Sequence, residues 1–453
     1  MPSIHTRAHG SLNIEGGIME LSSHDTVSGA MLKRRHLLRA ATRGAAGLAG
    51  IVLSKIPPAY AAQRTLTMLT LSHFIEAADD TLRQMAREFE EANRCQVKID
   101  YITHKEVHLI VPKEHQTRQG HDIVFFLYNM PQLHHEALDT LDFMEDLGRK
   151  LGGWYALARE IGQVQGRWVA MPWYCSAQAM TYREDLYKRH GFPPPRTWDA
   201  WKETGKQIKE TSGHKVGVTL NEDIDSNLAL YALLWSYGAS TVDADGHVRI
   251  NAPETRRAMD YMKELFTCCM TDEVLSWDAS GNNQAFLSGS YSWVHNPTSI
   301  YGSAKLRHNE IFEVTNHTLT PYGPGGQHGT ATPHNYGVWQ FAKEKDLAKV
   351  FLQYIMDLER LEYIFHVTST FNMPLFQAVE TFDWQRDPKT AVLKDFMKTV
   401  HMMGWPGPSD RRAEQAAQKF IVPKMFTFYV TGEKSLEEAV VWGEAALERI
   451  YKP

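Results

Sequence analysis

The chain has 453 residues, 43% of them hydrophobic, so it is long enough for two or three domains and lies well outside the composition of a disordered protein. Its 48 basic and 53 acidic residues give a formal net charge of -5, which offers no excess of positive charge to a nucleic-acid backbone. We therefore expect no nucleic-acid partner.

The segment 31–61, MLKRRHLLRAATRGAAGLAGIVLSKIPPAYA, combines clustered basic residues, a short apolar run and small residues at its end. This order is typical of a signal peptide, and Ala59 and Ala61 offer a cleavage site. The core KRRHLLR resembles the twin-arginine export signal, with Leu37 in place of the usual phenylalanine and Lys33 in place of Ser or Thr. We expect removal after Ala61 and a soluble, monomeric protein in the periplasm.

Residues 1–30 show no apolar periodicity, and we interpret them as a disordered extension or as an upstream mis-start. The four cysteines are Cys95, Cys175, Cys268 and Cys269. Neighbouring cysteines pair only through a strained ring, so we expect buried thiols at 268 and 269 rather than a disulfide.

The first predicted elements alternate between strand and helix. Residues 65–71, TLTMLTL, predict a strand, and residues 80–93 carry apolar side chains at helical spacing. Residues 97–102 alternate as a strand does, and residues 122–127, DIVFFL, are typical of a buried strand. This order indicates an open α/β sheet, in which ligands lie beyond the carboxyl ends of the strands.

A second α/β unit begins near Met180. Residues 182–192 predict a short helix that ends at Gly191, residues 215–220 predict a strand, and residues 226–239 predict a further helix.

Between these elements, Thr197 is expected to cap a helix on which Trp198, Trp201 and Ile208 share one face. We assign these tryptophans to the core.

Gly, Pro and Asn mark the remaining predicted turns, loops and helix starts. Residues 243–251, DADGHVRIN, predict a hairpin with an Asp-Gly turn, and Asn251 and Pro253 open a helix over 254–266. The stretch 321–337, PYGPGGQHGTATPHNYG, is rich in Gly and Pro and is expected to be a loop.

Four motifs together resemble extracellular solute-binding protein family 1, the sugar-binding components of ABC importers. They are VQGRWVAMPW (164–173), MTYREDLYKRHGFPPPRTWDAW (180–201), AFLSGSYSWVHNPTS (285–299) and HNYGVWQFAKEKDLAKVFLQYI (334–355). Two departures stand out. Arg183 replaces the usual Asn, and the common Asp- or Glu-rich sugar clamp is missing beside Trp173.

The resemblance implies an α/β, two-lobed periplasmic binding protein fold, in which each lobe is an open, mostly parallel sheet flanked by helices. The N-terminal lobe would comprise residues 62–175 and 319–370, and the C-terminal lobe residues 180–315 and 375–453. The strands that cross between the lobes would carry the chain past a ligand cleft. Pro172 would end the last strand of the first lobe, which leaves Trp173 and Tyr174 at the crossing.

Carbohydrate binding needs aromatic faces for C–H surfaces and planar polar groups for hydroxyls, and the expected cleft loops supply both. Seven candidate binding residues lie beyond the end of a strand, at the crossing or before a helix. They are His73, Phe74, Tyr128, Asn129, Trp173, Tyr174 and Asp225. Family position adds Asn296, Ser299, His334, Tyr336, Phe371 and Asn372.

No metal, cofactor or catalytic role is expected. His104 and His108 are four residues apart, as zinc ligands on a helix can be, but their stretch reads as a solvated polar loop. No Gly-x-Ser-x-Gly, Walker or Gly-x-Gly-x-x-Gly motif supports an enzyme. A carboxylate pair for glycoside hydrolysis stays open as an alternative, because its spacing is spatial.

The sequence therefore predicts a periplasmic substrate-binding protein that captures a sugar, oligosaccharide or polyol between two lobes and delivers it to an inner-membrane ABC permease. The alternatives are the same fold binding a polyamine, a glycerol-phosphate-like ester or an amino-acid derivative, and a secreted glycoside-processing enzyme.

Overall fold

The computed structural model describes residues 64–307 and 309–452. The expected extension 1–30 and export signal 31–61 lie outside the described residues. In the described part of the chain, no helix has both the length and the apolar character that crossing a bilayer requires.

The first sheet is mixed and contains the strands that were expected early in the chain. Its strands are β1 (Thr65–Leu71), β2 (Gln96–Ile102), β3 (Ile123–Leu127), β6 (Met171–Ala177), β13 (Gly329–Val338) and β14 (Val400–His401). Strand β1 lies between β2 and β3 and is parallel to both, because a helix returns the chain after each strand. Strand β13 runs antiparallel to β3 and to β6. The predicted strands at 65–71, 97–102 and 122–127 are confirmed.

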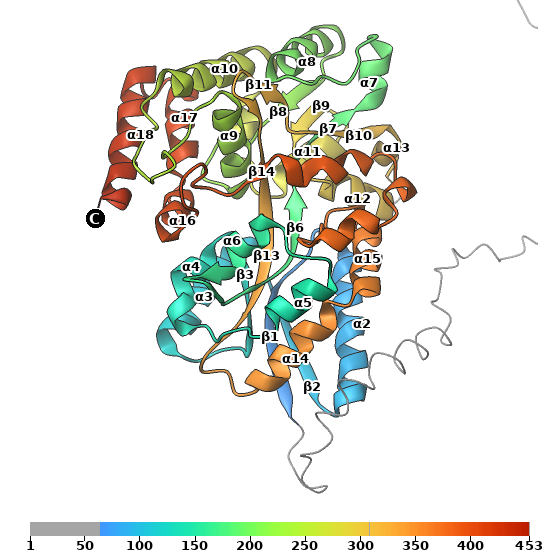
Figure 1. Ribbon diagram of the computed structural model, residues 1–453. Helices are drawn as coiled ribbons and strands as arrows, with labels where there is room; N and C mark the ends of the chain where they lie inside the picture. The colour runs from blue at the N-terminus through green and yellow to red at the C-terminus, as the bar shows by residue number, and fades with distance from the viewer. Residues whose placement is uncertain (1–63, 308, 453) are drawn as a thin grey trace, which may run out of the picture. The chain divides into compact units, whose positions relative to one another are not determined.

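The second sheet is also mixed, and its first strand, β7, follows β6 after one residue. Its strands are β7 (Ala179–Arg183), β8 (Lys215–Gly217), β9 (Tyr291–His295) and β10 (Thr315–Leu319), in the order β10-β7-β9-β8. Figure 1 shows β6 and β13 side by side, running from the first sheet towards the second. Two minor pairs complete the strands: β4 (Gln163–Val164) with β5 (Arg167–Trp168), and β11 (Tyr322–Gly323) with β12 (Gly326–Gln327).

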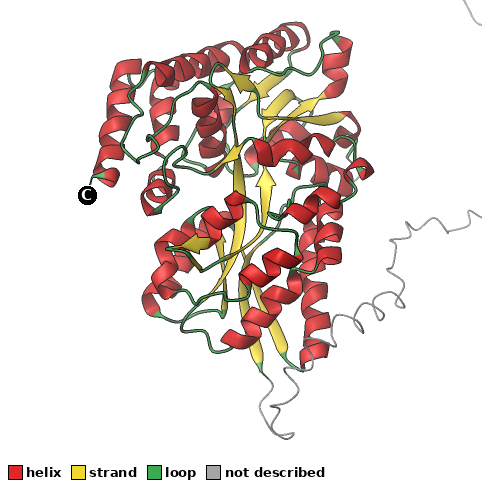
Figure 2. Cartoon of the chain, in the orientation of Figure 1, coloured by secondary structure: helices red, strands yellow, loops and turns green. Residues whose placement is uncertain are grey.

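Helices flank both sheets (Figure 2). Those beside the first sheet are α2 (Glu76–Asn93), α3 (His104–Thr117), α4 (Met130–His134), α5 (Met144–Lys150), α6 (Ala156–Gly162), α14 (Lys345–Ile355) and α15 (Leu358–Val367). Those beside the second sheet are α7 (Glu184–Arg189), α8 (Trp198–Ser212), α9 (Ile224–Ser236), α10 (Pro253–Cys269), α11 (Gly281–Leu287), α12 (Ser299–Leu306), α13 (Ile311–Val314), α16 (Arg411–Gln418), α17 (Ile421–Thr431) and α18 (Leu436–Tyr451). The 3-10 turns are η2 (His135–Ala137), η3 (Asp272–Leu275), η4 (Gln377–Thr381), η5 (Trp384–Arg386) and η6 (Ala391–Lys398).

Helix α8 forms as its sequence predicts. The Thr197 hydroxyl accepts a hydrogen bond from the Ala200 N–H at 3.2 Å, so it is the N-cap. The side chains of Trp198, Trp201 and Ile208 are buried on one face of the helix. Their assignment to the core is confirmed.

The stretch 321–337 is not the continuous loop that its glycines and prolines indicated. It contains the β11–β12 hairpin and most of β13, a ten-residue strand that is buried along its whole length. Pro333 is tolerated inside this strand because β3 pairs with β13 only from His334 onwards. The missing N–H of Pro333 therefore leaves no gap in the pairing with β3.

Two further expectations are corrected. The stretch around His104 is the helix α3 rather than a solvated loop. Thr103 and Glu106 form a capping box at its start, and Pro112 is accommodated within it. Residues 243–251 form a turn closed by the Val242–Val248 bridge rather than a hairpin of two strands.

Cys268 and Cys269 are joined in a disulfide, contrary to the expectation of two thiols. They lie at the end of α10, where the next residue, Met270, has left helical geometry for an extended conformation. Cys95 and Cys175 are buried free thiols.

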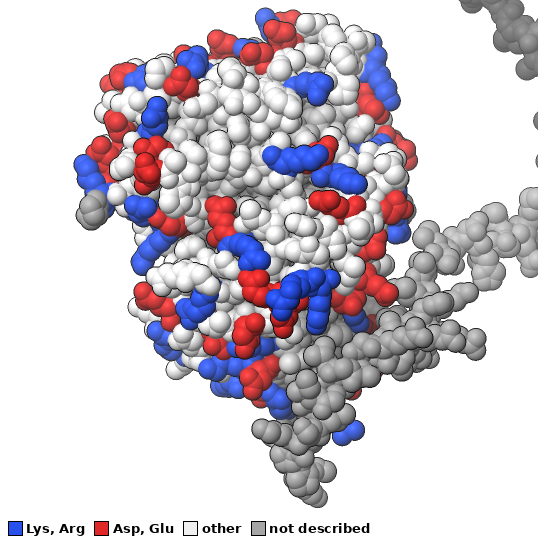
Figure 3. Space-filling view, viewed as in Figure 1, with Lys and Arg blue, Asp and Glu red and all other residues white. Residues whose placement is uncertain are grey.

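Charged side chains of both signs are interspersed on the face of the molecule in Figure 3. No continuous basic surface covers that face, which agrees with the net charge of -5.

Candidate binding site between the two sheets

The strand β6 contains Trp173 and Tyr174 within its length, so the expectation that Pro172 ends this strand is wrong. Tyr174 pairs with His334 of β13, whereas Asn335 pairs with Pro172, which leaves Trp173 as the extra residue of a β-bulge. Successive side chains of a regular strand point to opposite faces. The bulge re-aims one of them, so Trp173 and Tyr174 line the same cavity.

This first cavity lies at the carboxyl end of β1, next to β6 and β13. Its lining is Thr70, Leu71, His73, Ala78, Asp79, Leu82, Phe125, Trp173, Tyr174, His334 and Tyr336. The Tyr174 ring stacks on the His334 ring with centroids 4.3 Å apart, and the Trp173 ring tilts against Tyr336 at 5.3 Å. Aromatic faces therefore form most of its wall.

His73 is held in one orientation at the edge of this cavity. Its Nδ1 accepts a hydrogen bond from the Ile75 N–H at 2.9 Å, and its Nε2 donates to the Asn372 side-chain oxygen at 2.7 Å. Burial lowers the pKa of His73 to about 4, so its imidazole is neutral at neutral pH. The backbone N–H of His73 donates to Asp79, whose pKa burial raises to about 6.

A second cavity adjoins the first, and His334 lines both of them. The residues that line the second cavity come from elements near the first sheet and from elements near the second. Its lining is Phe74, His104, Ser176, Gln178, Ile224, Asp225, Ala279, Asn296, Pro297, Ser299, Thr332, His334 and Phe371. The Phe74 ring stacks on His104 at 5.2 Å and meets Phe371 edge-on at 6.3 Å. Rings cover one side of this cavity, and polar groups cover the other.

The polar side is a connected network of asparagines. The Asn282 amide donates to Asp225 at 2.7 Å and to Asn296 at 3.0 Å. The Asn296 amide in turn donates to Asn283 at 2.9 Å and to the Ser299 hydroxyl at 3.1 Å. These bonds fix the side chains before any solute arrives, which reduces the entropic cost of binding.

Ten of the thirteen side chains expected at a site line one of the two cavities, and Asn372 contacts His73. Tyr128 and Asn129 line neither. Tyr128 follows β3 with a φ of 46°, an uncommon conformation for a residue other than glycine. The Asn129 amide donates to the Ser409 backbone oxygen at 2.8 Å and to the Ser409 hydroxyl, and its N–H donates to Glu414 at 3.2 Å.

Sequence reasoning missed several lining residues. The sequence predicts a loop at His104, which lies on α3 instead. Ser176, Gln178 and Thr332 lie on or beside strands whose paths the sequence does not predict. The paired asparagines at 282 and 283 lie just before the family motif that begins at Ala285, and this position is the one signal in the sequence for them.

Three buried polar atoms on these linings have no hydrogen-bond partner within the described residues: Trp173 Nε1, Ser176 Oγ and His334 Nδ1. Buried polar groups in folded proteins are nearly always paired, because leaving one unpaired costs about 1–3 kcal/mol. A polar ligand that reaches these atoms would satisfy them.

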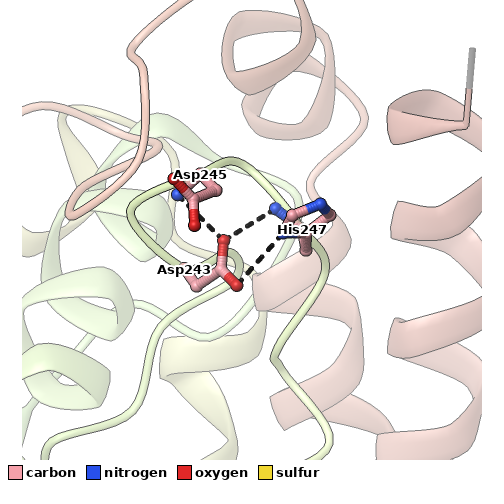
Figure 4. Close-up of side chains that lie close together, drawn as sticks. All are labelled: Asp243, Asp245 and His247. Carbon is pink, nitrogen blue, oxygen red and sulfur yellow. Dashed lines mark hydrogen bonds and ion pairs between the residues drawn. The ribbon is translucent and has the colours of Figure 1, made fainter.

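The described residues contain one group of three potential metal ligands, Asp243, Asp245 and His247 (Figure 4). The Asp243 carboxylate accepts hydrogen bonds from the backbone N–H groups of Asp245 and His247, at 3.0 and 2.9 Å. These bonds account for the turn itself, and the group lies apart from both cavity linings.

Comparison with known proteins identifies the fold. Maltose-bound MalE3 of T. maritima superposes with a TM-score of 0.76 at 19% identity, over 85% of this chain and 99% of that one. An ABC transporter solute-binding protein from Thermotoga lettingae TMO, bound with α-D-tagatose, gives a TM-score of 0.75 at 16% identity, over 86% and 100% of the two chains. The expected α/β periplasmic binding protein fold is confirmed.

Sequence relatives point the same way. A Deinococcus radiodurans protein named "Probable ABC transporter-binding protein" is 26% identical over 187 residues, which are 40% of this chain. The match spans 44% of that relative, less than half of its length. The family model described as "Bacterial extracellular solute-binding protein" matches residues 84–392. The family binds solutes rather than transforming them, so the enzyme alternative is set aside. The chain belongs to the bacterial extracellular solute-binding protein family.

Proposed function

We propose that the chain is the substrate-binding protein of an ABC importer and captures a carbohydrate, meaning a sugar, oligosaccharide or polyol, between two lobes. The observation that carries this proposal is the pair of adjoining cavities, where stacked rings face a fixed network of amides and hydroxyls. Rings cover the C–H faces of a sugar, and the amides and hydroxyls pair with its hydroxyl groups. The maltose and tagatose in the two similar structures support this ligand class.

The proposed lobes are residues 62–175 with 319–370, and 180–315 with 375–453. The inner-membrane ABC permease remains the proposed partner, and the twin-arginine-like signal the proposed route to the periplasm. Eleven of the thirteen candidates remain the proposed site residues. Tyr128 and Asn129 line neither cavity, and Asn129 is proposed to stabilise the closed form through Ser409.

We propose that the structure describes a conformation closed over the site. The two cavities have volumes of about 10 and 30 Å³, enough for one or two waters. Ligand pockets are usually roughly 300–1,000 Å³. We therefore propose that the lobes part to admit the solute and close around it, driven by contacts that form only in the closed state.

The charge of the lining argues against the phosphate-ester alternative. No lysine or arginine from residues 64–307 and 309–452 lines either cavity, whereas Asp79 and Asp225 do. A phosphate group would need positive charge or free backbone N–H groups.

A thermal-shift screen of the full chain across sugars, polyols, polyamines and phosphate esters tests the function. A carbohydrate at roughly 100 times its dissociation constant should stabilise the fold by about 2.7 kcal/mol, because it binds the folded chain alone. Stabilisation by phosphate esters, with no response to any sugar or polyol, would overturn the proposed ligand class.

Replacement of Trp173 by alanine should weaken binding of the best carbohydrate by roughly 1 to 3 kcal/mol, since it removes a buried aromatic anchor. Isothermal titration calorimetry measures this change. Trp384→Ala is the matched control, because Trp384 is equally buried but packs against Phe365, away from both cavities. If the Trp173→Ala variant binds the carbohydrate as tightly as the unchanged chain does, Trp173 does not belong to the site.

A further inference from the structure

The second cavity presents a single carboxylate, that of Asp225. One of its oxygens, Oδ2, accepts a hydrogen bond from the Asn282 amide, which donates to Asn296 as well. The Asp225 backbone N–H is bound by Asp223, the N-cap of α9. Both the backbone and the carboxylate of Asp225 are therefore fixed at the cavity wall.

This carboxylate lies in the first turn of α9, where the helix N-terminus carries partial positive charge, but no side-chain cation among the described residues lines the cavity beside it. Burial raises the pKa of Asp225 well above its usual value, and the carboxylates of Asp223 and Asp278 raise it further. Within the described residues, no lysine or arginine lines the cavity. An ionised carboxylate in such a place is costly unless a positive charge is brought to it.

Two unpartnered groups on the same lining indicate that a ligand completes this cavity. The Nδ1 of His334 and the hydroxyl of Ser176 have no hydrogen-bond partner among the described residues, and these side chains are 3% and 2% exposed. The rings of Phe74 and Phe371 lie on the same lining and provide apolar surface. One ligand therefore has to offer a positive charge, hydrogen-bonding groups and C–H surface together.

A metal ion does not fit as the missing charge. In the part of the chain that the structure describes, Asp243, Asp245 and His247 are the one set of three ligand side chains whose donor atoms lie within 4.8 Å of one another. Asp225 belongs to no such set. A charged group of the solute itself can supply the positive charge that the described cavity lining lacks.

We infer that the solute carries a protonated amino group that lies against the Asp225 carboxylate, so that its class is an amino sugar or an aminated polyol. This inference rests on the proposed function and narrows it. The rings of Phe74 and Phe371 cover the carbon skeleton, while Ser176 and His334 pair with its hydroxyl groups.

Calorimetric titration of the full chain at neutral pH tests the inference with matched pairs: glucosamine against glucose, galactosamine against galactose, and glucamine against sorbitol. The amine of at least one pair should bind about tenfold or more tightly than its hydroxyl twin, the usual gain from a charged hydrogen bond. Asp225→Asn should abolish that preference, so that the amine and its hydroxyl twin bind this variant with similar affinity.

Asp223→Asn is the control, because it removes the same charge two residues away, outside the cavity lining, and keeps an N-cap side chain. It should retain the preference, and equal loss in both variants would contradict direct contact with Asp225. Hydroxyl twins that bind as tightly as the amines would overturn the inference and leave the proposed function standing. Putrescine binding more tightly than every sugar and polyol, or no binding of any probe, would overturn the carbohydrate function itself.

Discussion

Trp201→Ala is expected to lower the free energy of unfolding by about 3–5 kcal/mol, the usual cost of deleting a buried tryptophan side chain. Trp201 is fully buried on the inner face of α8. Its ring meets those of Tyr182, Tyr187 and Trp293 edge-on, at centroid distances of 5.5, 5.4 and 5.6 Å. Alanine would leave a cavity among three large rings that cannot collapse without breaking their own contacts.

Urea denaturation followed by far-UV circular dichroism measures this loss. Tyr363→Ala is the control, because Tyr363 is 48% exposed on α15 and alanine is a good helix former. That variant should lie within about 0.5 kcal/mol of the unchanged chain. A loss below about 1 kcal/mol for Trp201→Ala would show that the second sheet is not packed around this side chain.

The helix that carries Trp201 illustrates which features local sequence determines. Its N-cap and its buried face depend on side chains within one or two turns, so Thr197 and the spacing of Trp198, Trp201 and Ile208 sufficed to predict it. The same holds for β1 and β3, whose apolar runs are continuous. Strand β13 could not be predicted in this way, because Pro333 and its neighbouring glycines are tolerated only through pairing with distant strands.

The residues of the candidate site differ in the same way: local sequence predicts some of them, and others depend on contacts with distant parts of the chain. His73 was predicted because it follows a strand whose carboxyl end is recognisable, and the structure places it at a cavity. The shared orientation of Trp173 and Tyr174 depends on a bulge that only the register of β6 and β13 reveals. Asn129 follows a strand in the same way as His73, but it bonds Ser409, which lies 280 residues further along the chain. No local pattern contains that contact.

Glu414→Gln should change the dependence of stability on pH. Glu414 lies on α16 and is 3% exposed. Its carboxylate accepts hydrogen bonds from the Asn129 N–H at 3.2 Å and from the Gln418 amide at 2.8 Å, both of them neutral donors. Because burial outweighs these bonds, the pKa of Glu414 rises to about 7 from its ordinary 4.5.

The direction of the effect follows from proton binding. Between pH 4.5 and about 7 the folded chain holds a proton on Glu414 that the unfolded chain has already released. Stability therefore falls as the pH rises through this window, by roughly 3 kcal/mol in total at about 1.4 kcal/mol per pKa unit. Below pH 4.5 the residue is protonated in both states and contributes no pH dependence.

Glutamine stays neutral at every pH, and its amide can accept from Asn129 while it donates to a reoriented Gln418. Urea denaturation at a series of pH values should therefore give equal stability for the two chains near pH 4.5 and an advantage for Glu414→Gln of up to roughly 3 kcal/mol above pH 7. Glu437→Gln is the control, since Glu437 is 64% exposed and paired with Arg256, and its curve should follow that of the unchanged chain. Parallel curves for all three proteins would mean that Glu414 is ionised within the fold.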